Sequence, residues 1–201
     1  MIDEATLPGA TERLERSQLA AAIAEAHGYQ RIGIDHFALP ADSLAVAARE
    51  GRLRRNFQGY TDDRCTTLIG LGCSAVSSLP RGYAQNIAAT GGYERAALDG
   101  RLATSRGIAL SDEDRMRGWV IERLMCEFAF SRRELTDRFG AAGVAVIAEA
   151  ERIADNDNEP LLEKCGELFV VSRESRPLVR SIAAKFDSYL PKGSARHSGA
   201  V

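Results

Sequence analysis

Residues 111–126 read SDEDRMRGWVIERLMC and predict an amphipathic helix. Ser111 has a side chain suited to an N-cap. Apolar side chains recur at the i, i+3, i+4 and i+8 spacing of one helix face, at Met116, Trp119, Val120 and Leu124. The stretch therefore predicts a helix from Asp112 to about Cys126 that buries one side.

The sequence after this helix predicts a module of further helices and a hairpin. In order, we expect a second helix opened by the capping box Ser131-Arg-Arg-Glu134, a third over 143–153, a hairpin of 161–164 and 168–172 around Cys165-Gly166, and a final helix from Pro177 to about Leu190. Helix, helix, helix, hairpin, helix is the order of a winged-helix domain. We assign this domain to residues 105–190 and expect a flexible tail over 191–201.

The sequence before this module predicts alternating helices and strands. The expected elements are a helix over 11–27 that stops at Gly28, a strand over 29–37, a short helix over 42–50 and a buried, glycine-punctuated strand over 68–77. In the first strand, Ile32, Ile34 and His36 would share a face. A helix, a glycine break and a strand form half of an α/β repeat, so residues 1–104 are expected to be an α/β segment.

The composition excludes several classes of protein. The 201 residues are 45% hydrophobic and 27% charged, as in ordinary globular domains. No stretch approaches 18 consecutive apolar residues, so no membrane-spanning helix is expected. The residues from Met1 to Glu4 are acidic and lack the basic start of a secretory signal, which makes the cytoplasm the expected location.

The winged-helix order raises DNA binding as an alternative function. From Arg106 to Asp187 there are 13 Lys and Arg residues against 16 Asp and Glu residues, and the third helix carries two glutamates and one arginine. A helix that reads DNA needs Arg, Lys, Asn or Gln on its exposed face, and cations that displace counterions. A structural or protein-contacting module is favoured, and no nucleic-acid partner is expected.

The four cysteines do not predict a metal site. Cys65, Cys73, Cys126 and Cys165 form no C-x-x-C or C-x-x-x-C-x-x-C clip, which zinc and iron–sulfur sites usually need to aim two thiolates at one metal. We therefore expect free thiols and no metal ligands in this chain.

Residues 51–63 predict a polar, ordered loop that carries the densest set of candidate ligand-binding residues. Two aromatic rings could stack on a planar ligand, and a glutamine offers two donors and an acceptor. Three arginines, Arg52, Arg54 and Arg55, could pair with carboxylates bidentately. The candidates are Arg54, Arg55, Phe57, Gln58 and Tyr60. An aromatic-anchored loop with a solvated basic rim fits the same residues equally well.

Two further motifs carry competing interpretations. Asp35-His36 at a strand end is a plausible proton-handling pair, although a hydrogen-bonded structural histidine is the commoner case. Residues 70–75 match the G-x-G-x-x-A dinucleotide fingerprint, but Ser77, Ser78 and Pro80 follow where a helix should begin. A strand whose glycines permit close approach is favoured there.

Six blocks of the sequence share the order and spacing of one family. They are G-Y-x-x-I-G-x-D-H-F-A (28–38), R-N-F-Q-G-Y-T (55–61), L-G-x-S-A (71–75), Y-x-Q-N (83–86), R-G (106–107) and F-D-x-Y-L (186–190). With these blocks, the chain resembles the oxygen-independent coproporphyrinogen III oxidases, which are radical S-adenosylmethionine enzymes of haem biosynthesis. The resemblance covers most of the chain, and its first two blocks together are highly specific.

This resemblance implies an oxidative decarboxylation. The family converts two propionates of coproporphyrinogen III to vinyl groups, giving protoporphyrinogen IX, and uses a [4Fe-4S] cluster and S-adenosylmethionine. The cluster is held by C-x-x-x-C-x-x-C in the N-terminal part of an incomplete barrel, and this sequence has no such motif. The chain thus resembles only the C-terminal portion, and we expect it to hold no cofactor and to be inactive alone.

The resemblance also transfers to single positions. It implies that Phe57 and Gln58 lie near a second S-adenosylmethionine or the substrate, and that Val76 lines S-adenosylmethionine. Asp35 and His36 match an Asp-His pair of unsettled role. Together with Arg54, Arg55 and Tyr60, this pair forms the expected substrate-facing set. Two departures change the charge nearby: Asp62 stands where the family usually has a second Thr, and Leu39-Pro40 replaces Arg-Pro.

The expected fold class is α+β, with terminal α/β elements of an incomplete radical-S-adenosylmethionine barrel followed by a winged-helix-like domain. The expected partners are the missing N-terminal half or a second copy, with coproporphyrinogen III as the substrate of the full enzyme. The alternative functions are a stand-alone tetrapyrrole-binding, S-adenosylmethionine-binding or protein-interaction module and, less favoured, a winged-helix DNA-binding regulator.

Overall fold

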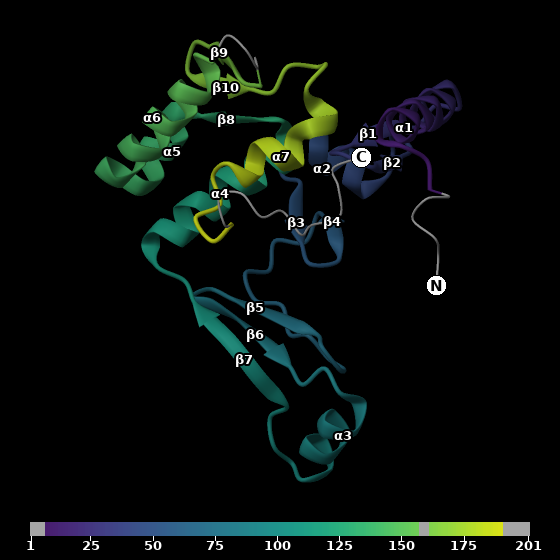
Figure 1. Ribbon diagram of the computed structural model, residues 1–201, viewed down its shortest axis with the longest axis vertical. Coiled ribbons are helices and arrows are strands. Elements are labelled where there is room, and N and C mark those ends of the chain that lie inside the picture. Colours follow the sequence, from purple (N-terminus) through teal and green to yellow (C-terminus); the bar gives the residue numbers. More distant parts are fainter. Residues whose placement is uncertain (1–6, 157–160, 191–201) are drawn as a thin grey trace. The chain divides into compact units, whose positions relative to one another are not determined.

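A computed structural model describes residues 7–156 and 161–190 of the chain, which forms two compact units (Figure 1). Unit 1 combines Met1–Asp62 with Met116–Val201, and unit 2 is Asp63–Arg115. These units divide the chain at residues 62 and 115, whereas the sequence predicted a boundary after residue 104. The expectations for Met1–Glu4 and for a tail over 191–201 lie outside the described residues.

Unit 1 begins with a helix and a hairpin. The predicted helix is confirmed as α1 (Ala10–Ala26). The single strand predicted over 29–37 is wrong, because β1 (Gln30–Ile32) and β2 (His36–Ala38) pair antiparallel with Ile32 opposite His36. Gly33 turns the chain between them with a φ of +58°, a conformation that glycine adopts at little cost.

A second hairpin follows the short helix α2 (Ser43–Arg49). Asp42 caps α2 by accepting a hydrogen bond from the Leu44 N–H at 2.8 Å, as helix-start chemistry predicts. The loop predicted over 51–63 is instead mostly a hairpin, in which β3 (Arg54–Asn56) pairs with β4 (Gly59–Thr61). Phe57 and Gln58 therefore form the tip of this hairpin.

The C-terminal part of unit 1 has the predicted winged-helix order. Its elements are α4 (Asp112–Glu127), β8 (Ala129–Ser131), α5 (Arg132–Phe139), the 3-10 turn η2 (Gly140–Ala142), α6 (Gly143–Ala154), β9 (Glu163–Cys165), β10 (Leu168–Val170), η3 (Arg176–Leu178) and α7 (Val179–Ala184). The strands form a sheet in the order β8-β10-β9. Ser131 caps α5 through the Glu134 N–H as predicted, but the last helix ends at Ala184 rather than near Leu190.

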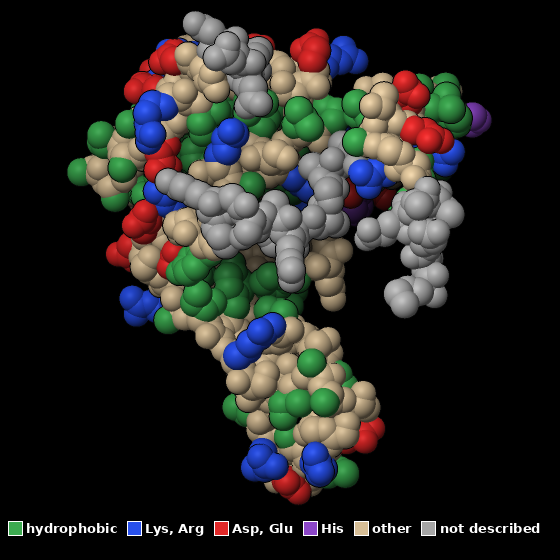
Figure 2. Space-filling model, in the orientation of Figure 1, with side chains coloured by type: hydrophobic (Ala, Val, Ile, Leu, Met, Phe, Trp, Pro, Cys, Tyr) green, Lys and Arg blue, Asp and Glu red, His purple; other side chains and the backbone are tan. Residues whose placement is uncertain are grey.

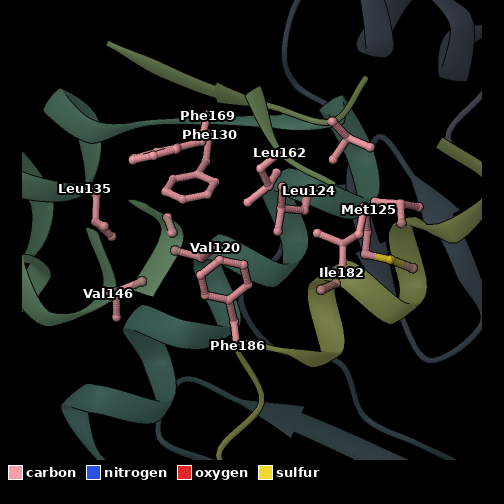
Figure 3. Close-up of a cluster of buried hydrophobic side chains, with 14 of the residues drawn as sticks. Val120, Leu124, Met125, Phe130, Leu135, Val146, Leu162, Phe169, Ile182 and Phe186 are labelled. Atoms are coloured by element: carbon pink, nitrogen blue, oxygen red, sulfur yellow. The ribbon is translucent and has the colours of Figure 1, made fainter. Parts of the chain in front are cut away.

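The largest core cluster lies between these C-terminal elements (Figure 3). Phe130 stacks on Phe169 with ring centroids 5.1 Å apart and meets Phe186 edge-on at 5.9 Å. All three rings are at most 2% exposed, and Val120 and Leu124 of α4 are fully buried against the same cluster. The apolar stripe predicted on α4 is therefore its buried face.

Unit 2 is a small sheet with one helix. It contains β5 (Val76–Leu79), β6 (Gly82–Asn86), α3 (Thr90–Leu98) and β7 (Thr104–Ala109), with strand order β5-β6-β7. The buried strand predicted over 68–77 is wrong, because residues before Val76 form a loop, apart from an isolated bridge between Leu68 and Ser78. The described mixture of helices and antiparallel strands, with no closed barrel among the described residues, confirms the α+β class.

Candidate functional site

The β3–β4 hairpin presents two of the predicted ligand-binding residues at its tip. The Asn56 side-chain oxygen accepts hydrogen bonds from the backbone N–H groups of Gln58 at 2.8 Å and of Gly59 at 3.2 Å. These two bonds hold the turn from within, as asparagine commonly does. Phe57 is 58% exposed and Gln58 is exposed as well, so the turn offers an apolar ring and an amide to a ligand.

Tyr60 anchors this hairpin from inside the protein. Its hydroxyl accepts a hydrogen bond from the Ile34 N–H at 3.0 Å and donates one to the Met125 carbonyl at 2.9 Å. The side chain is 8% exposed, and burial raises the pKa of Tyr60 above its ordinary value. The residue predicted to stack on a ligand is thus a buried link between the β3–β4 hairpin, the β1–β2 turn and α4.

Gly33 makes room for this link. A Cβ built on Gly33 would lie 2.1 Å from both the Cζ and the Oη atoms of Tyr60, far inside van der Waals contact. Glycine is therefore required at position 33 for two reasons. Its φ is positive, and the Tyr60 ring occupies the space that a side chain would fill.

The three arginines predicted to meet carboxylates have different surroundings, and Arg52 Nε donates to Glu50 Oε2 at 2.7 Å. Arg54 Nε donates a hydrogen bond to Glu122 Oε1 at 2.8 Å. The same oxygen accepts a second one from the backbone N–H of Arg55 at 3.2 Å. The Arg55 guanidinium lies 4.8 Å above the Tyr60 ring, as in a cation–π contact, and its buried Nη1 has no hydrogen-bond partner within the described residues. Arg54 ties the hairpin to α4, whereas Arg55 has donor capacity left.

Asp35 and His36 lie beside the hairpin. His36 Nδ1 is 2.9 Å from Asp35 Oδ1, and Arg180 Nη2 of α7 is 3.6 Å from Asp35 Oδ2. The imidazole meets the Tyr60 ring edge-on with centroids 5.0 Å apart. The fold therefore brings together two motifs, D-H and N-F-Q-G-Y-T, that are about twenty residues apart in sequence.

Val76, the third residue expected near S-adenosylmethionine, belongs to unit 2. It begins β5 opposite Gln85, directly after the glycine-containing loop of residues 69–75. A strand rather than a helix follows these glycines, which differs from a dinucleotide-binding turn.

Sequence reasoning missed the polar side chains that hold this glycine loop. The Asn86 amide donates to the carbonyls of Gly70 at 3.1 Å and of Gly72 at 3.0 Å. The Tyr93 hydroxyl accepts from the Gly72 N–H at 3.0 Å. The Y-x-Q-N block contained the signal, because an amide next to a glycine-rich loop can satisfy carbonyls that no strand pairs.

The described residues do not fit an iron–sulfur cluster. No group of three or more His, Cys, Asp or Glu side chains among them is arranged to hold a metal ion. Cys65 and Cys165 are exposed, whereas Cys126 is 6% exposed, and burial raises the pKa of its thiol to about 12. In the part of the chain described, no helix is both long and apolar enough to cross a membrane.

We expect this pKa to protect Cys126 from alkylation. At pH 8 the thiolate fraction of a thiol with a pKa near 12 is about 1,000-fold below that of an ordinary cysteine. Mass spectrometry after iodoacetamide treatment should show Cys65 and Cys165 modified first and Cys126 modified only after unfolding in guanidinium. Equal labelling rates for Cys126 and Cys165 in the folded chain would contradict the buried placement.

The comparisons with known proteins agree on one family, although no protein-family model matches the chain. The chain is 44% identical over 202 residues to an oxygen-independent coproporphyrinogen III oxidase of Bradyrhizobium diazoefficiens, covering all of this chain and 45% of the relative. It is 46% identical over 190 residues to one of Cereibacter sphaeroides, covering 94% and 42% respectively. The chain therefore spans less than half the length of these relatives.

The structural comparison gives the same result. The coproporphyrinogen III oxidase of Escherichia coli, described as a radical SAM enzyme, superposes with a TM-score of 0.85 at 37% identity, over 94% of this chain and 44% of that one. The fold is thus that of part of a radical S-adenosylmethionine protein. More narrowly, the chain is homologous to the C-terminal portion of the oxygen-independent coproporphyrinogen III oxidases.

Proposed function

We propose that this chain supplies the C-terminal part of an enzyme that oxidatively decarboxylates coproporphyrinogen III. The observation that carries the proposal is the hairpin tip, which exposes Phe57 and Gln58 on a base fixed by Asn56 and Tyr60. A rigid support with an apolar ring and an amide at its tip is suited to orienting a planar or nucleoside-bearing ligand. A cytoplasmic location, in line with the cysteine usage, is part of this proposal.

In this proposal, residues of this chain bind and orient S-adenosylmethionine and the substrate. Phe57 forms an apolar wall and Gln58 supplies donors and an acceptor. Val76 is a separate proposal, for an aliphatic contact to S-adenosylmethionine. Because Glu122 engages the Arg54 guanidinium, Arg55, which forms no ion pair with the described residues, is the better candidate for a propionate. S-adenosylmethionine with an iron–sulfur cluster supplies the oxidising chemistry when bound, and the cluster belongs to residues that this chain does not contain.

The surface of unit 2 supports a need for a partner. Within Asp63–Arg115 only Gly82 and Ala96 are buried. Hydrophobic side chains are visible on the face of this unit shown in Figure 2. The strongly exposed large apolar side chains of the unit include Ile69 (64%), Leu71 (85%), Leu98 (87%) and Leu102 (90%). We propose that the N-terminal portion found in the relatives, or failing that a second copy, covers this surface.

The charges around α6 support a role other than DNA reading. Arg117 pairs bidentately with Glu149 at 2.8 and 3.2 Å, and Arg132 pairs with Glu151 at 2.7 Å. These ion pairs engage two of the cations that phosphate contacts would need.

Complementation tests the proposed function. The chain would be co-produced anaerobically with the N-terminal portion of the Bradyrhizobium relative, and conversion of coproporphyrinogen III to protoporphyrinogen IX would be followed by chromatography. We expect activity from the pair and from neither part alone. Activity of this chain alone, or inactivity of a stable, cluster-loaded pair, would contradict the proposal.

Gln58→Ala separates a ligand-binding turn from a structural one. Because the amide is exposed, its loss is expected to change the unfolding free energy by less than about 0.5 kcal/mol. We expect the activity of the complemented pair to fall at least tenfold, and the melting temperature to stay within about 2 °C. The matched control is Asn56→Ala, which removes the bonds inside the turn and should lower both. Full activity with Gln58→Ala would assign the turn a structural role.

A further inference from the structure

We propose that His36 accepts a hydrogen bond, through Nε2, from an N–H group of the ligand at the Phe57–Gln58 turn, and that Asp35 is the positioning residue that makes it an acceptor. This inference rests on the proposed function and assigns the Asp-His pair a role. It requires that His36 has one defined tautomer, that Nε2 lies beside the turn, and that the ligand carries an N–H donor.

The Asp35 contact defines the tautomer. An ionised carboxylate can only accept hydrogen bonds, so at 2.9 Å from Asp35 Oδ1 the Nδ1 atom of His36 carries the proton. In the neutral ring, Nε2 then has a lone pair and no hydrogen. Arg180 Nη2 lies 3.6 Å from the other carboxylate oxygen of Asp35.

The backbone of Gly59 defines the position. A Cβ built on Gly59 would lie 3.3 Å from His36 Nε2, so this nitrogen lies against the first residue of β4, next to Gln58. The edge-on contact with the buried Tyr60 ring fixes the imidazole plane. No described residue hydrogen-bonds to Nε2, and the side chain is 43% exposed, so a ligand can reach it.

The required ligand group is an N–H donor on a flat heteroaromatic ring. A tetrapyrrole has such donors at its inner nitrogens, and S-adenosylmethionine has one in its adenine amino group. An acceptor at this position would favour either group over a carboxylate, which could only repel the lone pair. The charged propionates would then face the Arg55 side rather than His36.

Nitrogen NMR of the 201-residue chain tests the tautomer directly. Only three histidines are present, and His27 is an internal control, because its Nδ1 lies 2.8 Å from the Ile23 carbonyl and needs no carboxylate. In alkaline buffer we expect the His36 ring to carry its proton on Nδ1 and none on Nε2. Asp35→Asn should mix the two tautomers of His36 and leave His27 unchanged. A protonated Nε2 in the unsubstituted chain would overturn the proposal.

Anaerobic titration of the same sample with S-adenosylmethionine or with coproporphyrinogen III tests the ligand and distinguishes its two sources. We expect the Gln58 amide and His36 Nε2 to shift together with one of them. His36→Leu should weaken that binding about tenfold, and His36→Gln, which keeps an acceptor, should restore most of it. A shift at Gln58 without one at His36 would overturn this inference and leave the proposed function standing. No shift at either residue with either probe would overturn both.

Discussion

Gly33→Ala is expected to lower the free energy of unfolding by about 3–4 kcal/mol. A non-glycine residue at a φ of +58° costs about 1–2 kcal/mol. The new methyl group would also lie 2.1 Å from the Tyr60 ring, and overpacking of this kind costs about 1–3 kcal/mol more. Urea unfolding followed by circular dichroism measures the loss.

Gly28→Ala is the matched control for this prediction. Gly28 also has a positive φ, +84°, but a Cβ there would meet no atom within 4 Å, so only the backbone cost of about 1–2 kcal/mol remains. A double-mutant cycle with Tyr60→Leu should recover part of the Gly33→Ala loss, because the ring that clashes is gone. Equal losses for Gly33→Ala and Gly28→Ala would show that the close approach is not real.

Phe130→Ala is expected to destabilise the protein by about 3–5 kcal/mol, as large-to-small changes of buried aromatic residues do. The ring is 2% exposed and contacts both Phe169 and Phe186. Because those two rings come from β10 and from the segment after α7, the loss should loosen β10 and that segment. Hydrogen exchange of the Phe169 amide, which would lose protection, measures this local effect.

Phe57→Ala is the control, because the same chemical change occurs at a ring that is 58% exposed. We expect its unfolding free energy to stay within about 0.5 kcal/mol of the starting value. Its effect should fall on ligand binding at the turn instead. A Phe57 substitution as costly to stability as Phe130→Ala would mean that the hairpin tip is part of a core.

Elements with local signals could be predicted from the sequence. The caps at Ser111 and Ser131 and the apolar stripe of α4 depend on residues within about one or two helical turns, and the structure confirms them. The strand predicted over 29–37 failed because apolar alternation continues through Ile34, while the turn depends on Gly33. Alternation alone cannot distinguish one strand from a tight hairpin when the deciding neighbour, Tyr60, is distant in sequence.

The sequence named the residues of the candidate site but did not predict how the fold arranges them. Exposed Phe57 and Gln58 and the Asp35-His36 pair all lie at or beside the β3–β4 hairpin, and their functional assignments remain predictions. The inward position of Tyr60 could not be predicted, because an aromatic ring in a polar stretch fits either a binding surface or an anchor. Its partners, Ile34 and Met125, are 26 and 65 residues away, so only the fold identifies them.

The insertion of unit 2 between the hairpins and α4 has a consequence for biosynthesis. Arg54 and Tyr60 reach their α4 partners across 68 and 65 residues. At about 5–20 residues per second, a ribosome needs roughly 3–13 s to produce that interval. During this time the apolar groups around Tyr60 and Leu53 lack the helix that covers them in the finished fold. The nascent N-terminal segment is therefore a natural client for a holding chaperone until α4 emerges.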